Sequence, residues 1–149
     1  MSMFLGIDAA ASGLTAERLR MDVISNNIAN ANTTRTRTGG AYHRRYVIFE
    51  PRETDSNTFE SYLQKKIHKL EPGAGVRAIG IGTNNEQGPL VYDPTHPDAN
   101  AQGYVERPNV NMVSEMVDMI TASRAYEANT TTIDAAKAMV SKALEIGNK

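Results

Sequence analysis

Cysteine is absent from the 149-residue sequence, and so is tryptophan. The lack of cysteine excludes disulfide frameworks, thiol nucleophiles and cysteine-ligated zinc sites together. Aromatic residues make up only 6% of the chain, so we do not expect a core built on large rings. The 16 basic and 17 acidic residues leave a net charge of -1, which gives no overall attraction to nucleic acid or to an anionic membrane.

The sequence also has no run of about 18 apolar residues that could span a bilayer. Its first residues, MSMFLGIDAAASGL, contain no lysine or arginine, and Asp8 interrupts their apolar part. This pattern is atypical of a cleaved secretory signal. If the protein leaves the cytoplasm, we therefore expect a different export route.

Apolar residues recur every seven positions near both ends of the chain. The repeat comprises Ile7, Leu14, Met21 and Ile28 in the N-terminal part, and Met112, Met119, Tyr126, Ile133 and Val140 in the C-terminal part. This spacing places each set on one side of a helix. Asn111 is a suitable N-cap for the second helix and Gly147 a suitable stop, which predicts a rod about 50 Å long.

Between these helices, glycine and proline occur too often for any long helix. Short strands are predicted at 46–50, 76–81 and 89–92, where β-branched and aromatic residues gather. A shorter helix is also predicted in the middle of the chain, on the spacing of Phe59, Leu63, Ile67 and Leu70.

These elements predict a mainly α fold with a small β-rich insertion. Residues 1–33 and 109–149 would pair as a coiled-coil-like axial domain, with residues 34–108 between them. Burial of the four N-terminal repeat residues contributes roughly 6 to 12 kcal/mol, whereas ordering about 25 residues costs about 1 to 2 kcal/mol each. The segment 112–120 also spreads apolar side chains more widely than one partner helix can cover. The helices therefore form either a hairpin within one chain or a hairpin that also packs on other copies.

Four asparagines occupy the seven positions NNIANAN at the expected end of the first helix. Asn26 and Asn30 lie one turn apart on the face away from the apolar repeat, and Asn27 and Asn32 flank that repeat. Their amides could cap a frayed helix end, or they could bridge to the backbone of a neighbouring molecule. Asn129, within the C-terminal repeat, is either a partly exposed helical residue or a device that fixes helix register.

Three short motifs have functional interpretations that the sequence supports only weakly. Residues 73–78 fit a dinucleotide-binding pattern, but strand-like residues follow where a helix is required. DPTHPD (93–98) offers metal-ligand side chains, although its two prolines are typical of a rigid turn. YHRRY (42–46) could contact nucleic acid through arginine and stacked tyrosine. Because no nucleophile or metalloprotease motif is present, we expect no enzyme, no cofactor, no metal site and no small-molecule substrate.

Two long stretches resemble a known family. SGLTAERLRMDVISNNIANANT (12–33) resembles the N-terminal signature of flagellar rod, hook and hook-associated proteins. DPTHPDANAQGYVERPNVNMVSEMVDMITASRAYEAN (93–129) is similar to the corresponding region of a proximal-rod protein of the bacterial flagellar basal body. The resemblance covers both ends of the chain and is weak over 52–86. Ala41 stands where relatives usually carry a proline.

The resemblance implies a structural subunit of the bacterial flagellar basal-body proximal rod that assembles helically through its terminal helices and transmits torque, without contacting nucleic acid. It implies type III export without a cleaved signal peptide, a place in the periplasm-spanning rod, and contact with FlgB, FlgF, FlgG and the adaptor FliE. The expected subunit interface comprises Ile7, Leu14, Met21, Asn26, Asn27, Ile28, Asn30, Asn32, Met112, Met116, Met119, Ile120, Tyr126, Asn129, Ile133 and Val140. The alternative is a soluble helical adaptor that binds a single partner.

Overall fold

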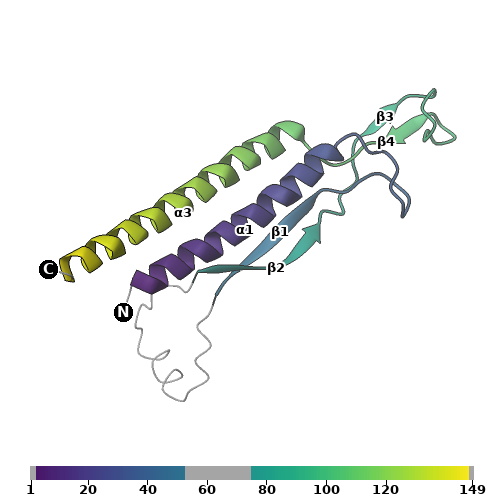
Figure 1. Cartoon of the computed structure of the whole chain (residues 1–149). Coiled ribbons are helices and arrows are strands. Elements are labelled where there is room, and N and C mark those ends of the chain that lie inside the picture. The colour runs from purple at the N-terminus through teal and green to yellow at the C-terminus, as the bar shows by residue number, and fades with distance from the viewer. Residues whose placement is uncertain (1–2, 53–74, 148–149) are drawn as a thin grey trace, which may run out of the picture.

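Two long antiparallel helices form the frame of the molecule (Figure 1). The computed structural model describes residues 3–52 and 75–147. Helix α1 spans Met3–Ala29 and helix α3 spans Met112–Gly147. The start of α1 and the end of α3 lie at the same end of the molecule. Neither helix contains, among the described residues, a segment long and apolar enough to cross a membrane.

The start and end of α3 confirm the N-cap and the stop that the sequence predicted. The side-chain oxygen of Asn111 accepts hydrogen bonds from the backbone N–H groups of Val113 (3.0 Å) and Ser114 (3.2 Å), as an N-cap does. The helix ends at Gly147 after 36 residues. At 1.5 Å per residue its length is about 54 Å.

A two-stranded antiparallel hairpin packs on α1, on a side that α3 leaves free (Figure 1). It consists of β1 (Arg45–Pro51) and β2 (Val76–Thr83), with a change of register between Ile48 and Phe49. The hydroxyl of Ser12 accepts a hydrogen bond from the Val76 N–H at 3.0 Å and so ties β2 to α1. Helix α1 therefore lies between α3 and this hairpin.

A second, smaller sheet lies at the end of the molecule where α1 ends and α3 begins (Figure 1). Strand β3 (Leu90–Tyr92) pairs antiparallel with β4 (Tyr104–Glu106). The two terminal helices and the first three strands confirm the sequence predictions, and the mainly α fold with a small β-rich part is confirmed as well. Strand β4 was not predicted. The helix predicted on Phe59 to Leu70 lies outside the described residues.

The buried core consists largely of small side chains. Among the described residues, five of the nine buried apolar ones are alanine, and the nine are Ala10, Ala16, Val23, Ile24, Ala41, Tyr42, Val105, Ala122 and Ala136. A Cβ atom at Gly13 would lie 2.7 Å from Nδ2 of Asn129, which shows how closely α1 approaches α3. The core therefore forms through the close approach of two backbones at small residues, and it does not depend on many large aromatic rings.

The centre of the contact on α3 differs from the predicted repeat. The fully or nearly buried residues of α3 are Glu115, Ala122 and Ala136, which share a seven-residue spacing. The predicted large residues Met119, Tyr126, Ile133 and Val140 are half-buried beside this line. The reason is steric: where two backbones approach closely, small side chains fit between them and large ones lie at the flanks. On α1, the predicted Ile7, Leu14, Met21 and Ile28 are likewise half-buried.

Candidate assembly interface

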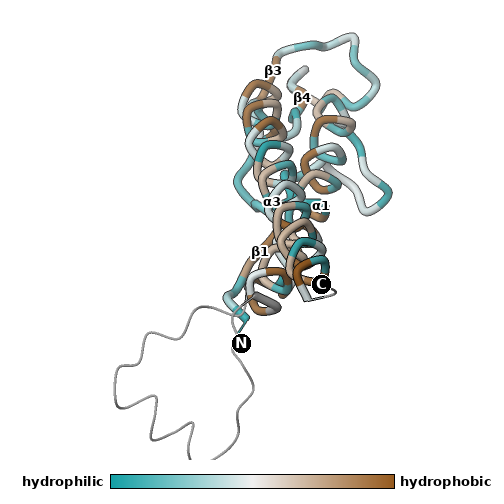
Figure 2. Tube along the Cα trace, turned by 60° about the vertical axis from the view of Figure 1, so that its left-hand side comes forward, coloured by the Kyte–Doolittle hydropathy of each residue, from teal (hydrophilic) through white to brown (hydrophobic). Residues whose placement is uncertain are grey.

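The first turns of α3 carry an exposed apolar stripe, which we define as Val113, Met116, Val117 and Ile120. Their exposed fractions are 72, 54, 57 and 54%. The spacing i, i+3, i+4, i+7 places all four on one helix face. Buried Glu115 faces α1, so this stripe faces away from it. Figure 2 shows the hydrophobic character of this part of α3.

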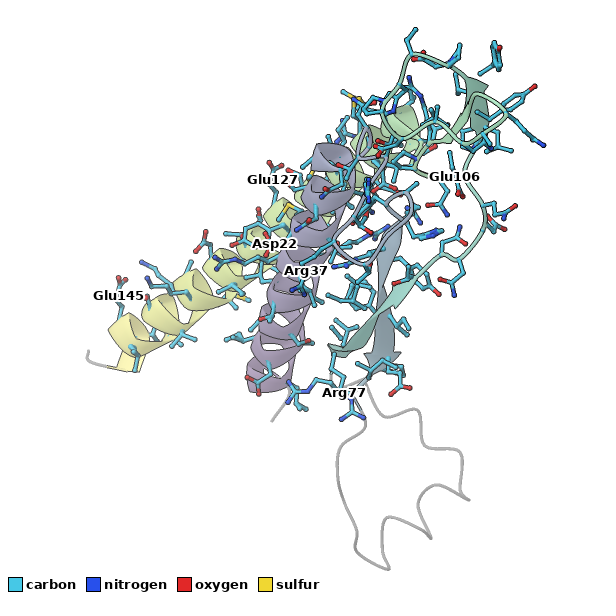
Figure 3. The ribbon with its side chains drawn as sticks, turned by 90° about the vertical axis from the view of Figure 1, so that its right-hand side faces the viewer. Asp22, Arg37, Arg77, Glu106, Glu127 and Glu145 are labelled. Carbon is cyan, nitrogen blue, oxygen red and sulfur yellow. The ribbon has the colours of Figure 1, made fainter. Side chains whose placement is uncertain are left out.

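Beyond Ile120 the outward face of α3 changes in character. Glu127 and Glu145 project away from α1 (Figure 3), and Arg124 is exposed on the same side of the helix. The hydroxyls of Thr130 and Thr131 donate to carbonyls one turn earlier in their own helix, at 3.0 and 2.9 Å. A charged and threonine-rich surface therefore follows the apolar stripe, and exposed apolar side chains return near the end of α3 at Met139, Leu144 and Ile146.

The β-rich part exposes further apolar side chains. Leu90 and Tyr92 are 66 and 65% exposed, and the rings of Tyr92 and Tyr104 meet edge-to-face with centroids 5.2 Å apart. On the larger hairpin, Ile79 and Ile81 are about half exposed. A large contiguous apolar patch on a soluble protein usually marks a contact with another molecule. The stripe of α3 and the exposed side chains of the β-rich part are therefore candidates for such contacts.

A polar cluster with a buried centre, the polar junction, joins α1, the segment that leads into β1, and α3; it comprises Asn27, Tyr42, Arg44, Glu115 and Asp118. The amide nitrogen of Asn27 donates to the Arg45 carbonyl (2.8 Å) and to Oε2 of Glu115 (2.9 Å). Its oxygen accepts from the Tyr42 hydroxyl and from the Arg45 N–H, both at 3.0 Å. All four hydrogen-bonding positions of this amide are therefore used within one chain.

The polar junction also balances the charge of Glu115, which has no exposed surface. Its Oε1 accepts a hydrogen bond from Nε of Arg44 at 2.5 Å, while Nη2 of Arg44 reaches Asp118 at 3.2 Å. Arg20 of α1 lies 3.8 Å from the other oxygen of Asp118. Because Glu115 also lies in the first turn of α3, the helix dipole favours its negative charge.

Asn109 holds the segment before α3 against the start of β1. Its side-chain oxygen accepts from the Arg44 N–H at 2.7 Å, and its nitrogen donates to the carbonyls of Asn84 and Glu86. The Asn84 N–H in turn donates to the Arg44 carbonyl at 2.8 Å. Arg44 is thereby fixed through its backbone as well as its side chain.

Tyr42 should give the polar junction a measurable dependence on pH. Burial raises the pKa of its hydroxyl above 10.0, the Arg45 cation lowers this pKa, and the Glu115 charge raises it. A raised folded-state pKa adds stability that is complete below pH 10 and is lost as the pH rises through that pKa. Tyr42→Phe should cost about 0.5 to 1.5 kcal/mol near neutral pH. The difference in urea midpoint between this variant and the native chain should shrink above pH 10; a difference that stays constant to pH 11 would contradict this assignment.

The structure separates the four asparagines that the sequence grouped together. Asn27 is buried and serves its own chain, which differs from its expected place at a subunit interface. Asn30 donates to the Asn26 carbonyl at 2.9 Å, as an amide at a helix end does. Asn26 and Asn32 are exposed and Asn30 is half-buried. Only these three can offer polar groups to a neighbour.

The other expected interface residues fall into two groups. Met112, Met116 and Ile120 are exposed and free to contact another molecule. The half-buried positions are Ile7, Leu14, Met21, Ile28, Met119, Tyr126, Asn129, Ile133 and Val140. Sequence reasoning did not select the exposed side chains of the β-rich part, although the short apolar runs LVY and YVE are a signal that could have found them.

The alternative motifs have structural roles. Residues 93–98 form a turn in which Asp93 accepts hydrogen bonds from the hydroxyl and N–H of Thr95, and these bonds lower the pKa of Asp93. Tyr42 of the YHRRY segment is buried, and Arg44 is engaged by Glu115 and Asp118. These two side chains are therefore unavailable to stack on bases or bind phosphate.

Comparisons with known proteins agree with this arrangement. Residues 7–35 match the family described as "Flagella basal body rod protein", and residues 101–146 match "Flagellar basal body rod FlgEFG protein C-terminal". The chain is 49% identical over 154 residues to the flagellar basal-body rod protein FlgC of Borreliella burgdorferi, with 98% of both chains covered. Identity to FlgC of Bacillus subtilis is 43%, and to FlgC of Salmonella typhimurium 32%, each with 99% of both chains covered.

Proposed function

The chain belongs to the FlgC family of flagellar basal-body rod proteins, and we propose that it assembles helically into the proximal rod by packing its terminal helices on those of neighbouring subunits. As a member of this family it is a structural subunit of the rod, located in the flagellar basal body. We further propose that it crosses the inner membrane through the flagellar export apparatus without losing a signal peptide, and occupies the periplasm-spanning part of the rod.

The observation that carries this proposal is the unpartnered apolar stripe of α3. Helix α1 covers one side of α3, and the stripe lies on the other. Burying its four side chains would contribute roughly 1.5 to 3 kcal/mol for each one that becomes fully covered. A second subunit supplies the cover that residues 3–52 and 75–147 of a single chain do not provide.

A rod also needs contacts between unlike surfaces. When one surface of a subunit meets a different surface of the next and the rotation does not close, a helical filament results. The stripe of α3 and the exposed side chains of β3 and β4 are two such unlike surfaces. We propose that the neighbours in the rod include further copies of this chain, FlgB, FlgF and FlgG, with FliE at the base.

Asn26 and Asn30 are proposed to take part in these contacts. Both residues lie at the end of α1, where Asn26 is exposed and Asn30 is half-buried, and Asn30 orients Asn26 by bonds of 2.9 and 3.2 Å to its oxygens. The exposed amide of Asn26 can bond to the backbone of a neighbouring subunit.

Mixing experiments test the proposed assembly. Circular dichroism and sedimentation of the isolated chain would be compared with those of the chain mixed with the other rod proteins. We expect helix content and particle size to rise in the mixture and with concentration. The Asn26→Ala/Asn30→Ala variant should keep its fold and assemble less. An isolated chain that is fully helical and stops at one defined complex would contradict rod assembly and favour a single-partner adaptor.

A further inference from the structure

We propose that Asn27 and Glu115 are positioning residues that select the axial register of α3 on α1. Three contacts define this register: Asn27 with Glu115 (2.9 Å), Arg20 with Asp118 (3.8 Å) and the close approach of Gly13 to Asn129. The α1 members of these contacts are spaced by seven residues. The buried line of α3 has the same period.

Apolar packing alone discriminates poorly between registers in this seam. If α3 moved by seven residues along α1, Ala122 would take the place of Glu115 opposite Asn27, and Ala136 would take the place of Asn129 opposite Gly13. Alanine fits both places, because it is smaller than the residue it would replace. The helix faces would also keep their alignment, since seven residues make nearly two full turns. A displaced register is therefore sterically permitted.

The buried polar groups make the native register lower in free energy than the displaced one. A seven-residue displacement would carry the Glu115 carboxylate about 10 Å along the axis from Asn27 and Arg44. Asn27 has no exposed surface, so its amide would be left with an unsatisfied donor in the core. Each buried polar group without a partner costs about 1 to 3 kcal/mol, and a charged group costs more. A single buried polar residue is known to fix register in paired helices in the same way.

The contacts that fix the register also involve residues outside the two helices. Arg44, directly before β1, binds Glu115, and the Arg45 backbone binds both polar ends of the Asn27 side chain. Since β1 also packs on α1, a slipped α3 could not retain the bond between Arg44 and Glu115, whereas the bonds between Arg45 and Asn27 would stay in place. This inference concerns the folded chain and does not rest on the proposed assembly. For a rod, the inference means that the polar junction fixes the axial position of the apolar stripe relative to α1.

Spin-label distances test the register directly. The chain contains no cysteine, so Arg18→Cys and Lys142→Cys place two unique labels at exposed sites on α1 and α3. The labelled chain would be diluted with unlabelled chain in a sucrose buffer, which favours compact states. We expect one distance in the native background. Asn27→Ala and Glu115→Ala should each add a second distance displaced by up to about 10 Å, which is seven residues of helix rise.

Asn26→Ala is the matched control, because it removes an exposed amide next to Asn27 and should leave a single unshifted distance. If Asn27→Ala does not fold, the Asn27→Ala/Glu115→Ala variant removes both buried partners while Arg44 keeps Asp118, and it should show both registers. A native background with two distances, or variants that keep one unshifted distance, would overturn the proposal. In that case Asn27 would contribute stability alone.

Discussion

Arg44→Ala is expected to lower the free energy of unfolding by about 3 to 5 kcal/mol, the usual cost of leaving a buried charge without its partner. Glu115 has no exposed surface, and Nε of Arg44 is the cation within 2.5 Å of it. Asn27 would still donate one hydrogen bond to the carboxylate, but it carries no positive charge. At about 2 kcal/mol per molar urea, the midpoint of the helical circular dichroism signal should fall by about 2 M.

Arg77→Ala provides the matched control for this prediction. Arg77 also pairs with a glutamate, Glu50, at 3.7 Å, but both side chains are at least half exposed. Ion pairs of that kind contribute about 0 to 1 kcal/mol. Arg44→Lys should fall between the two, because lysine keeps the charge and loses the fork that reaches Glu115 and Asp118 together. Equal midpoints for Arg44→Ala and Arg77→Ala would show that the polar junction does not hold the fold together.

The regular parts of this fold could be predicted because their signals are local. The N-cap at Asn111, the stop at Gly147 and the apolar repeats each depend on a few neighbouring residues. The strands Arg45–Pro51 and Val76–Thr83 were found from β-branched and aromatic content in the same way. Such signals do not require knowledge of what lies across the core.

The polar junction could not be predicted because its members are far apart in the sequence. Asn27 and Glu115 are separated by 88 positions, and Arg44 lies 71 positions before Glu115. The sequence placed Asn27 beside the apolar repeat and Asn26 away from it, but it did not show that the amide of Asn27 would be enclosed. Glu115 was an ordinary acidic residue in a first helical turn. Only the packing of α1, β1 and α3 decides which amide is enclosed. The same limit explains why Arg44 and Tyr42 suggested a nucleic-acid contact before the structure placed them inside.

The exposed apolar stripe was partly predictable, because its width exceeds what one helix can cover. The sequence indicated that the segment 112–120 was apolar over more than one face. It did not show that the line through Glu115 and Ala122, rather than that through Met112 and Met119, faces α1. That choice depends on how closely the two backbones approach, which the small side chains at Gly13 and Ala122 determine.

Ile120→Asp is expected to abolish assembly with the other rod proteins while leaving the isolated fold nearly unchanged. Ile120 is 54% exposed in the single chain, so its replacement should alter the free energy of unfolding by no more than about 1 kcal/mol. In an assembled rod the same position would be covered. An unpaired carboxylate buried there should cost more than about 3 kcal/mol, which weakens association at least a hundredfold. Sedimentation of mixtures and motility of cells carrying the variant would measure this loss.

Thr121→Asp separates an effect of the stripe from an effect of charge. It adds the same charge one residue further along, about 100° around the helix from Ile120 and beside the stripe rather than within it, at a position that is also exposed. Assembly of Thr121→Asp should remain close to that of the native chain. If both variants assemble normally, the stripe of α3 faces solvent in the rod and the contacts must use the β-rich part. If both variants fail to assemble equally, added charge anywhere on this turn is the cause. A contact specific to the stripe requires that only the Ile120→Asp variant lose assembly.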